Sequence, residues 1–187
     1  MHGHRHRNIP SAFEGRSSRV YNFVARRLLR RVYRRLAEDI ARLAPENAAI
    51  LDVGTGPGVL LMELAALRPD LRLTGVDLSA DMVAAATANL APYAPRASAR
   101  VGDATNLPFE DSSFDLIVSS LSLHHWDDPA AAKPELARVL RPGGRVVIYD
   151  VRFAPFDLLA GGDRAERSRV RTGIPLFPRL TRFVLSS

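Results

Sequence analysis

The chain has 187 residues, 47% of them hydrophobic, and a formal net charge of +6, values that suit one domain with a substantial core. The absence of cysteine excludes disulfides, a thiol nucleophile and thiolate metal sites. No apolar run approaches the roughly 20 residues of a membrane span, and the basic N-terminus lacks the apolar stretch of a signal peptide. We expect a cytoplasmic protein without a bound metal, either a monomer or a homodimer.

Residues 1–17 are predicted to form a flexible tail. His2, His4 and His6 alternate with other residues there and could ligate a metal ion. A flexible terminus is the simpler interpretation, because terminal residues that nothing ties down are poorly ordered.

Residues 18–45 carry the first regular pattern. Apolar residues recur every four positions from Val20 to Ile40, as on one face of an amphipathic helix. The pattern is longer than a common helix of about 12 residues, so we expect two helices or a bend, ended by Pro45.

Arginine pairs repeat at the same interval on this segment and therefore share a face. A solvated helix face is the preferred interpretation, because charged faces are common. An anionic substrate, RNA or a membrane surface is the alternative partner. The arginines are Arg26, Arg27, Arg30, Arg31, Arg34 and Arg35.

A short apolar strand, residues 48–51, leads into a turn that contains Gly54, Gly56 and Gly58, and good helix formers begin at Val59. Glycines let the backbone approach a ligand closely, and a helix start offers unpaired N–H groups to an anionic group. The order strand, glycine turn, helix therefore predicts a ligand-binding loop.

The spacing distinguishes this loop from other nucleotide-binding loops. A dinucleotide-binding turn reads Gly-x-Gly-x-x-Gly, a P-loop ends in Gly-Lys-Ser/Thr, and neither pattern is present here. Asp52 would repel a pyrophosphate but suits a ligand with a cationic end. The segment from Asp52 to Gly58 resembles the first motif of the class I methyltransferases that use S-adenosylmethionine, a net cationic cofactor.

The second predicted strand ends at Asp77, about 20 residues past the glycine turn, where an acid accepts two hydrogen bonds from ribose hydroxyls in nucleotide-binding folds. Ser79 is better placed to cap the following helix, which leaves Asp77 for the ribose. Leu78 and Met82 are candidates for apolar contact with an adenine ring, or plain core residues.

A weak third strand, residues 97–101, precedes Gly102, Asp103 and Ala104. In the methyltransferases that this sequence resembles, the acid of this Gly-Asp pair accepts a hydrogen bond from the adenine amino group. Gly-Asp pairs are usually turns; the position after the third strand favours the functional interpretation of Asp103.

The fourth strand, residues 114–120, includes Ser119 and is followed by His124-His125-Trp126. Ligands of open α/β sheets bind at the carboxyl ends of the strands, which is where this segment lies. His124 and His125 both carry an imidazole, the group best suited to act as a general base near neutral pH, and His124 is the candidate catalytic residue. The same tripeptide recurs in relatives with varied substrates, so a mainly structural role is preferred.

Asp128 and Pro129 predict the start of the next helix, and residues 142–144, Pro-Gly-Gly, predict its end. The stretch 135–144 looks very like the signature that follows strand four in the same enzymes. A fifth strand, residues 145–151, comes next.

The remaining chain predicts a short helix over residues 156–160 and antiparallel strands over 168–174 and 180–185. Five strand–helix units with a terminal hairpin predict an α/β, doubly wound sheet. The resemblance implies a Rossmann-like sheet of seven strands in the order 3-2-1-4-5-7-6, with strand 7 antiparallel. After the tail, one methyltransferase domain is expected, composed of entry helices 18–45, a cofactor-binding core 46–151, and an abbreviated helix with a hairpin 152–187.

The resemblance implies methyl transfer from S-adenosylmethionine to an unidentified small-molecule acceptor by in-line displacement. The alternatives are an RNA methyltransferase or RNA-surface module that uses the arginine face, and a nicotinamide-dependent oxidoreductase. Tyr21 resembles a tyrosine that closes over the cofactor, or is a packing residue. The expected cofactor-binding set is Tyr21, Asp52, Gly54, Thr55, Gly56, Gly58, Asp77, Leu78, Met82, Asp103, Ala104 and Ser119.

Overall fold

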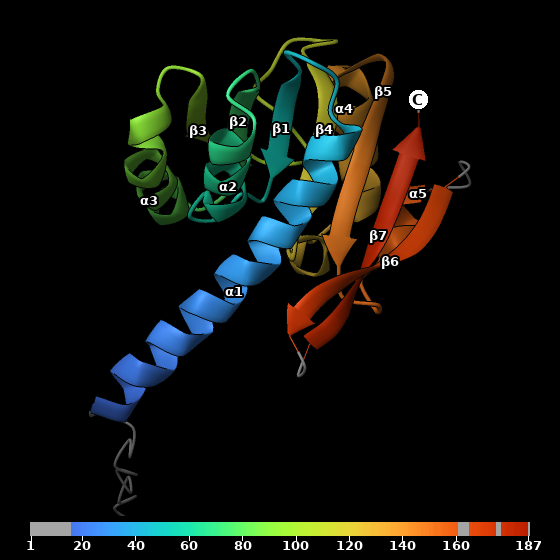
Figure 1. Cartoon of the computed structure of the whole chain (residues 1–187). Helices are drawn as coiled ribbons and strands as arrows, with labels where there is room; N and C mark the ends of the chain where they lie inside the picture. Colours follow the sequence, from blue (N-terminus) through green and yellow to red (C-terminus); the bar gives the residue numbers. More distant parts are fainter. Residues whose placement is uncertain (1–15, 161–164, 175–176, 187) are drawn as a thin grey trace, which may run out of the picture.

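The computed structural model describes residues 16–160, 165–174 and 177–186, and the side chains of these except for 16–28 and 177–178. Helices and strands alternate along the chain (Figure 1). The elements are α1 (Arg16–Leu43), β1 (Ala49–Val53), α2 (Val59–Leu67), β2 (Arg72–Asp77), α3 (Ala80–Leu90), η1 (Ala91–Tyr93), β3 (Ala97–Val101), β4 (Phe114–Ser120), η2 (Leu123–His125), α4 (Pro129–Val139), β5 (Leu140–Asp150), α5 (Phe156–Ala160), β6 (Ala165–Ile174) and β7 (Phe177–Ser186).

Seven strands form one sheet in the order β3-β2-β1-β4-β5-β7-β6. Strands β1 to β5 are parallel, and β7 runs antiparallel to both of its neighbours. The carboxyl ends of the parallel strands therefore lie at one edge, the lower edge in Figure 1. The predicted doubly wound fold, the strand order and the antiparallel strand 7 are confirmed.

Helices cover both faces of the sheet, because the central strands are apolar on both sides. In β1, Ile50 packs into a core with α1 and α2, whereas Leu51 packs into a second core with α4 and α5. Both side chains have no exposed surface. This alternation fixes which residue of each strand faces which layer.

The expectation of two helices or a bend before β1 was wrong. Helix α1 is a single helix of 28 residues, since no glycine or proline interrupts the segment. Val32, Leu36 and Ile40 are buried against the body, and the first half of the helix extends beyond the sheet (Figure 1). No helix in the described ranges is long and apolar enough to cross a membrane.

Helix α4 begins as predicted, since the Asp128 carboxylate accepts a hydrogen bond from the backbone N–H of Ala131 at 2.9 Å. It ends at Val139, earlier than predicted, because Leu140 already pairs with Phe114 of β4. The register then shifts around the predicted Pro-Gly-Gly turn, so this turn forms an irregularity within β5. The terminal hairpin is confirmed, with longer strands than predicted.

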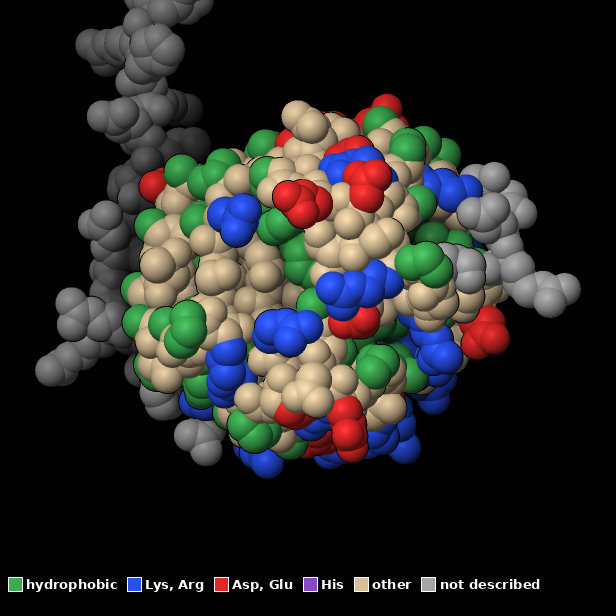
Figure 2. Space-filling view, turned by 90° about the horizontal axis from the view of Figure 1, so that it is seen from above, with side chains coloured by type: hydrophobic (Ala, Val, Ile, Leu, Met, Phe, Trp, Pro, Cys, Tyr) green, Lys and Arg blue, Asp and Glu red, His purple; other side chains and the backbone are tan. Residues whose placement is uncertain are grey.

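At the edge where the strands begin, arginines are paired with acids. Arg68 contacts Asp70, and Arg141 contacts Asp115, each at 2.7 Å. Figure 2 shows Lys/Arg and Asp/Glu side chains interspersed on this edge. The excess positive charge of the chain is therefore not concentrated here.

Candidate cofactor-binding site

A cavity of about 570 Å³ lies where β1, β2, β3 and β4 end, as the crevice rule for open α/β sheets predicts. The loops after these strands supply most of its lining, and α1 adds Tyr33. Of the residues predicted to bind the cofactor, eight line this cavity: Gly54, Thr55, Gly56, Asp77, Leu78, Met82, Asp103 and Ala104.

The glycine turn uses backbone conformations that favour glycine. Gly54, Gly56 and Gly58 have φ values of +71°, +53° and +75°. A Cβ on Gly54 would lie 1.8 Å from the Ser122 Oγ, so only glycine lets the two loops meet. A Cβ on Gly56 would meet nothing within 4 Å, because this residue faces the cavity.

Gly58 has a packing role in this structure. It is the N-cap residue of α2, and a Cβ there would lie 3.2 Å from the Cβ of Ala86 on α3. Gly58 is not among the residues that line the cavity. The third glycine of the motif thus lets two helices approach each other.

Asp77 lies at the end of β2 with both carboxylate oxygens oriented by the backbone. Its Oδ2 accepts a hydrogen bond from the Gly56 N–H at 2.8 Å, and its Oδ1 accepts one from the Ser79 N–H at 2.9 Å. Each carboxylate oxygen can accept a further bond, so the group is held in place and still able to bind hydroxyls. Ser79 caps α3 as predicted.

Two apolar side chains beside Asp77 are exposed to the cavity. Leu78 is 70% exposed and Met82 is 44% exposed. Large apolar side chains that line a cavity and are left uncovered provide a surface for a flat, apolar ligand group. This placement matches the position proposed for adenine contact and differs from the plain core interpretation.

Asp52 lies beneath the turn, outside the cavity lining, and has no exposed surface. Its Oδ2 accepts a hydrogen bond from the Thr55 hydroxyl at 2.8 Å, while its Oδ1 has no partner in the described part of the chain. Burial raises the pKa of Asp52 to about 7, and the negative charge of Asp77 adds to the shift. Thr55 is the residue that connects Asp52 to the cavity.

The segment after β3 closes one side of the cavity with Gly102, Asp103, Ala104 and Thr105. The Asp103 Oδ1 accepts a hydrogen bond from the Thr105 N–H at 2.8 Å. This carboxylate is therefore oriented by its own loop, at the place where the sequence predicts an adenine contact.

The segment after β4 supplies a different serine and a different histidine from those predicted. Ser120 lines the cavity, whereas Ser119 is buried on the opposite face of the sheet. His125 also lines it. The ring of His124 instead contacts the buried carboxylate of Asp150, with 2.7 Å between Nδ1 and Oδ1.

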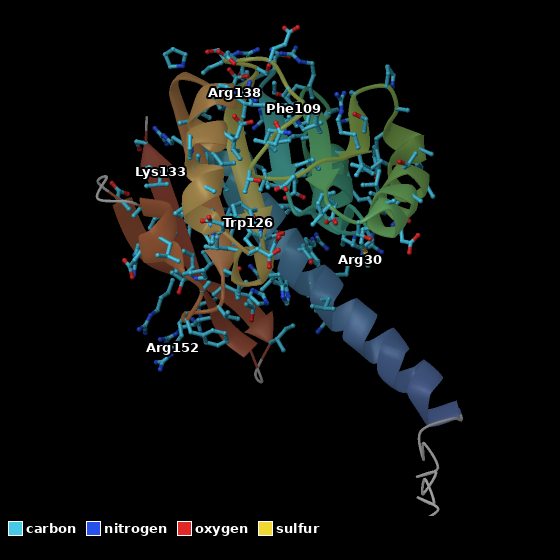
Figure 3. The ribbon with its side chains drawn as sticks, turned by 180° about the vertical axis from the view of Figure 1, so that it is seen from behind. Arg30, Phe109, Trp126, Lys133, Arg138 and Arg152 are labelled. Atoms are coloured by element: carbon cyan, nitrogen blue, oxygen red, sulfur yellow. The ribbon has the colours of Figure 1, made fainter. Side chains whose placement is uncertain are left out.

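Trp126 completes this wall, and its indole N–H donates to the Ser122 hydroxyl at 2.9 Å. Figure 3 shows Trp126 beside α1, away from the edge that carries Arg138 and Phe109. The two histidine rings that precede it have centroids 3.9 Å apart, so His124 supports the ring of His125.

Three predicted features lie outside the described side chains. They are the Tyr21 side chain, the Arg26 and Arg27 part of the arginine face, and the histidines at positions 2, 4 and 6. Tyr33, which lines the cavity from α1, was not among the predicted site residues. Its place on the apolar face beside Leu36 and Ile40 was the available signal.

The sequence profile of the methyltransferase domain family matches residues 51–148, more than half of the chain. The chain belongs to this family. The matched range runs from β1 to β5 and includes most of the cavity lining. The prediction of a methyltransferase domain that uses S-adenosylmethionine is confirmed at the level of the family.

This methyltransferase domain is similar to several known proteins. It is 38% identical to the ubiquinone/menaquinone biosynthesis C-methyltransferase UbiE of Geotalea daltonii, over 74% of this chain and 61% of that protein. It is 35% identical to the 27-O-demethylrifamycin SV methyltransferase of Amycolatopsis mediterranei, over 73% of this chain and 50% of that protein. The chain thus spans between half and two thirds of the length of these curated relatives.

The fold also matches a solved structure over nearly the full length of both chains. A Methanococcus maripaludis protein, solved as a candidate S-adenosyl-L-methionine-dependent methyltransferase, has a TM-score of 0.73 at 22% identity and covers 98% of this chain and 97% of its own. At this identity the likeness supports the fold alone.

The cavity of this methyltransferase domain is acidic. Asp77, Asp103, Asp127 and Asp128 line it, and no lysine or arginine of the described residues does. An acidic cavity attracts a cationic ligand and repels a pyrophosphate. Together with the open space at Gly56, this lining fits S-adenosylmethionine.

Proposed function

We propose that this chain transfers a methyl group from S-adenosylmethionine to a small-molecule acceptor. The observation that carries the proposal is the acidic cavity, built on a glycine turn at the carboxyl edge of a methyltransferase fold. When bound, S-adenosylmethionine supplies a methyl group on a cationic sulfonium that a nucleophile can displace. The names of the two curated relatives, one a C-methyltransferase, support small organic acceptors.

The chain's own residues would hold the cofactor by charge and shape. Asp77 would accept hydrogen bonds from the ribose, and Asp103 one from the adenine amino group. Leu78 and Met82 would contact the adenine ring. Gly54 and Gly56, whose backbone approaches the cavity closely, would border the methionyl group.

Tyr33 and Trp126 would border the reacting end of the cavity and exclude water. An acceptor that enters with a proton needs a base, and His125 is the imidazole that lines the cavity. We propose that His124 positions this ring. A carboxylate oxygen of Asp150 lies 2.7 Å from the Nδ1 of His124, and it would orient this ring by accepting a hydrogen bond from Nδ1.

The rival functions are less compatible with the cavity. A nicotinamide dinucleotide carries two phosphates, which four aspartates would repel. An RNA substrate would need basic residues close to the reacting centre, and the described lining has none. The lining of the cavity offers no specific observation in favour of either rival.

Calorimetry with S-adenosylmethionine and S-adenosylhomocysteine tests the cofactor. Asp77→Ala removes acceptors whose charge-assisted hydrogen bonds are each worth about 1.5–3 kcal/mol, so affinity is expected to fall at least about tenfold. Asp81→Ala is the matched control, since Asp81 is an exposed acid in the first turn of α3, outside the cavity. It is expected to bind as the wild type does.

Absence of heat and of a thermal shift with both ligands would overturn the proposal, as would binding of NAD instead. The acceptor class is tested separately by incubating the protein and a methyl-labelled cofactor with either total RNA or a small-molecule extract. Label is expected in the extract fraction. Label in RNA would favour the first rival.

A further inference from the structure

A second hollow, of about 410 Å³, lies between α1 and the end of β6. It is lined by Arg31, Arg34, Arg35, Glu38, Thr172 and Gly173. It shares no residue with the cofactor cavity. Nothing in the proposed methyl transfer uses it.

Helix geometry explains why these side chains meet. Positions 31, 34, 35 and 38 are spaced by three and four residues, so they form one face of α1. Leu36 and Ile40 on the apolar face are fully buried, and the hollow therefore lies on another side of the helix from the core. Residues of β6 reach this face and close the hollow.

The charges in this hollow are not balanced. Three guanidinium groups face one carboxylate, and Glu38 lies 3.5 Å from Arg34 and 3.8 Å from Arg35. These contacts are long and the arginines are mostly exposed, so the pairs are weak. Within the described ranges, no hydrogen bond or ion pair involves the Arg31 guanidinium.

Arginines elsewhere on the molecule contrast with these three. Arg30, the neighbour of Arg31 on the same helix, contacts Glu63 at 2.7 Å. Arg68 and Arg141 at the opposite edge of the sheet have equally short contacts. The three arginines of the hollow differ from these paired arginines because they share one carboxylate among them.

The pairing of strand β6 with β7 is irregular beside the hollow. The pairing of β6 with β7 shifts in register between Arg171 and Ile174. Gly173, within this shift, has a φ of +76°, and a Cβ there would meet nothing within 4 Å. The irregularity therefore leaves open space beside the guanidinium groups.

We propose that this hollow binds a phosphoryl group. Guanidinium groups present parallel N–H donors that match phosphate oxygens in bidentate pairs. A phosphoryl group carries up to two negative charges, which equals the excess of positive charge in the hollow. The group belongs either to a soluble phosphate ester or to a phospholipid headgroup, and the two sources can be separated by experiment.

The bound phosphoryl group neutralises the repulsion among the arginines and connects α1 to the terminal hairpin. It therefore stabilises the folded protein. The hollow and the cofactor cavity share no lining residue, so they are separate sites. The sequence favoured a solvated helix face for these arginines. We instead propose a binding site, because residues of two separate elements, α1 and β6, line the hollow.

The test uses inorganic pyrophosphate as the soluble probe, and vesicles of phosphatidylglycerol in phosphatidylcholine as the lipid probe. Calorimetry and thermal unfolding follow pyrophosphate, and flotation follows the vesicles. Arg31→Glu is expected to weaken binding at least about tenfold. The matched control is Arg145→Glu, an exposed arginine on β5 for which the described part of the chain shows no ion pair.

Pyrophosphate binding that is lost in Arg31→Glu and kept in Arg145→Glu supports a soluble ester. Vesicle binding alone, with the same dependence on Arg31, supports the headgroup. Each measurement is made both without and with S-adenosylhomocysteine. The measurement without it does not depend on the cofactor proposal, and an unchanged result with it shows that the probe does not bind in the cofactor cavity. Absence of binding to both probes, or equal losses in the two variants, overturns the proposal.

Discussion

Asp52 is a fully buried carboxyl group with one hydrogen-bond partner, and its environment makes its charge depend on pH near neutrality. Burial raises the pKa of Asp52 to about 7, well above the ordinary value for aspartate. Between that ordinary value and pH 7, the folded protein holds a proton that the unfolded chain has released. The contribution of Asp52 to stability is therefore favourable at low pH and is lost as the pH rises through 7.

Asp52→Asn is expected to raise the free energy of unfolding of the ligand-free protein at pH 8. The upper limit is about 4 kcal/mol, from a shift of about three pKa units at about 1.4 kcal/mol each. The amide oxygen of Asn can still accept from Thr55, so the turn is preserved. Urea unfolding at pH 5 and pH 8 measures the change, which is expected to be less than half as large at pH 5 as at pH 8.

Asp115→Asn is the control, and the change in the free energy of unfolding is expected to have the opposite sign. Burial raises the pKa of Asp115, but hydrogen bonds from Arg141 and the Ala49 N–H outweigh it and lower the pKa overall. This variant is expected to lose stability at pH 8. An Asp52→Asn variant that is also less stable at pH 8 would show that Asp52 is ionised and stabilised in the free protein.

At the residue scale, many residues that line the cavity were predictable, because side chains suited to the cofactor follow strands whose ends meet at one edge of the sheet. Asp77 and Asp103 each follow a strand end, and the glycine turn has its own signature. Ser119 and His124 each lie one position from a residue that lines the cavity. A sequence shows that a strand ends near a site, but the side on which each residue emerges depends on the exact register.

Helix α1 places Tyr33 at the border of the cofactor cavity. The resemblance implies Tyr21 for this role, and the Tyr21 side chain lies outside the described ones. Burial, and then the charge of Asp52, raise the pKa of Tyr33, as expected for a ring that lies against the floor of the cavity. Because Tyr33 would cover part of a ligand bound in this cavity, its removal is expected to speed ligand release.

Tyr33→Ala is expected to accelerate dissociation of S-adenosylhomocysteine several-fold in stopped-flow experiments, whereas Tyr33→Phe keeps the wild-type rate. Tyr93→Ala is the control, since Tyr93 is a half-buried tyrosine outside the cavity. Faster release in Tyr21→Ala with no change in Tyr33→Ala would show that Tyr21, and not Tyr33, covers the bound ligand.

Element bounds were predictable where capping chemistry marks them. Ser79 and Asp128 accept hydrogen bonds from the first turns of α3 and α4, and both helices start where predicted. The end of α4 was misplaced because strand pairing with β4 starts before the Pro-Gly-Gly turn. The expected bend in α1 rested on length alone, which is a weaker signal than an interrupting residue.

At the scale of the whole molecule, one polar network connects α1 to the sheet and its terminal hairpin. The hydroxyl of Tyr149 on β5 donates to Asp39 Oδ2 on α1 at 2.9 Å. Arg182 on β7 lies 3.1 Å from the same carboxylate, and also donates to Ser168 on β6. Tyr149 is fully buried, so its hydroxyl depends on Asp39.

Removing the Asp39 carboxylate is expected to lower the free energy of unfolding more than removing the Tyr149 hydroxyl. Tyr149→Phe removes one hydrogen bond and leaves Asp39 paired with Arg182, so we expect a loss of about 1 kcal/mol in the free energy of unfolding. Asp39→Ala leaves a buried hydroxyl and a guanidinium group without their acceptor, so a loss of about 3 kcal/mol is expected. Urea unfolding measures both values.

The double variant tests whether the groups act as one unit. With Asp39→Ala in place, Tyr149→Phe removes an unsatisfied hydroxyl, and it is expected to restore about 1 kcal/mol instead of costing it. Arg42→Ala is the control, because Arg42 is an exposed neighbour 3.6 Å from Asp39, and a change below about 0.5 kcal/mol is expected. Additive losses in the double variant would show that α1 is held by its apolar face alone. The coupled result would show that β5, through the hydrogen bond from Tyr149 to Asp39, helps to fix the helix that places Tyr33 in the cofactor cavity.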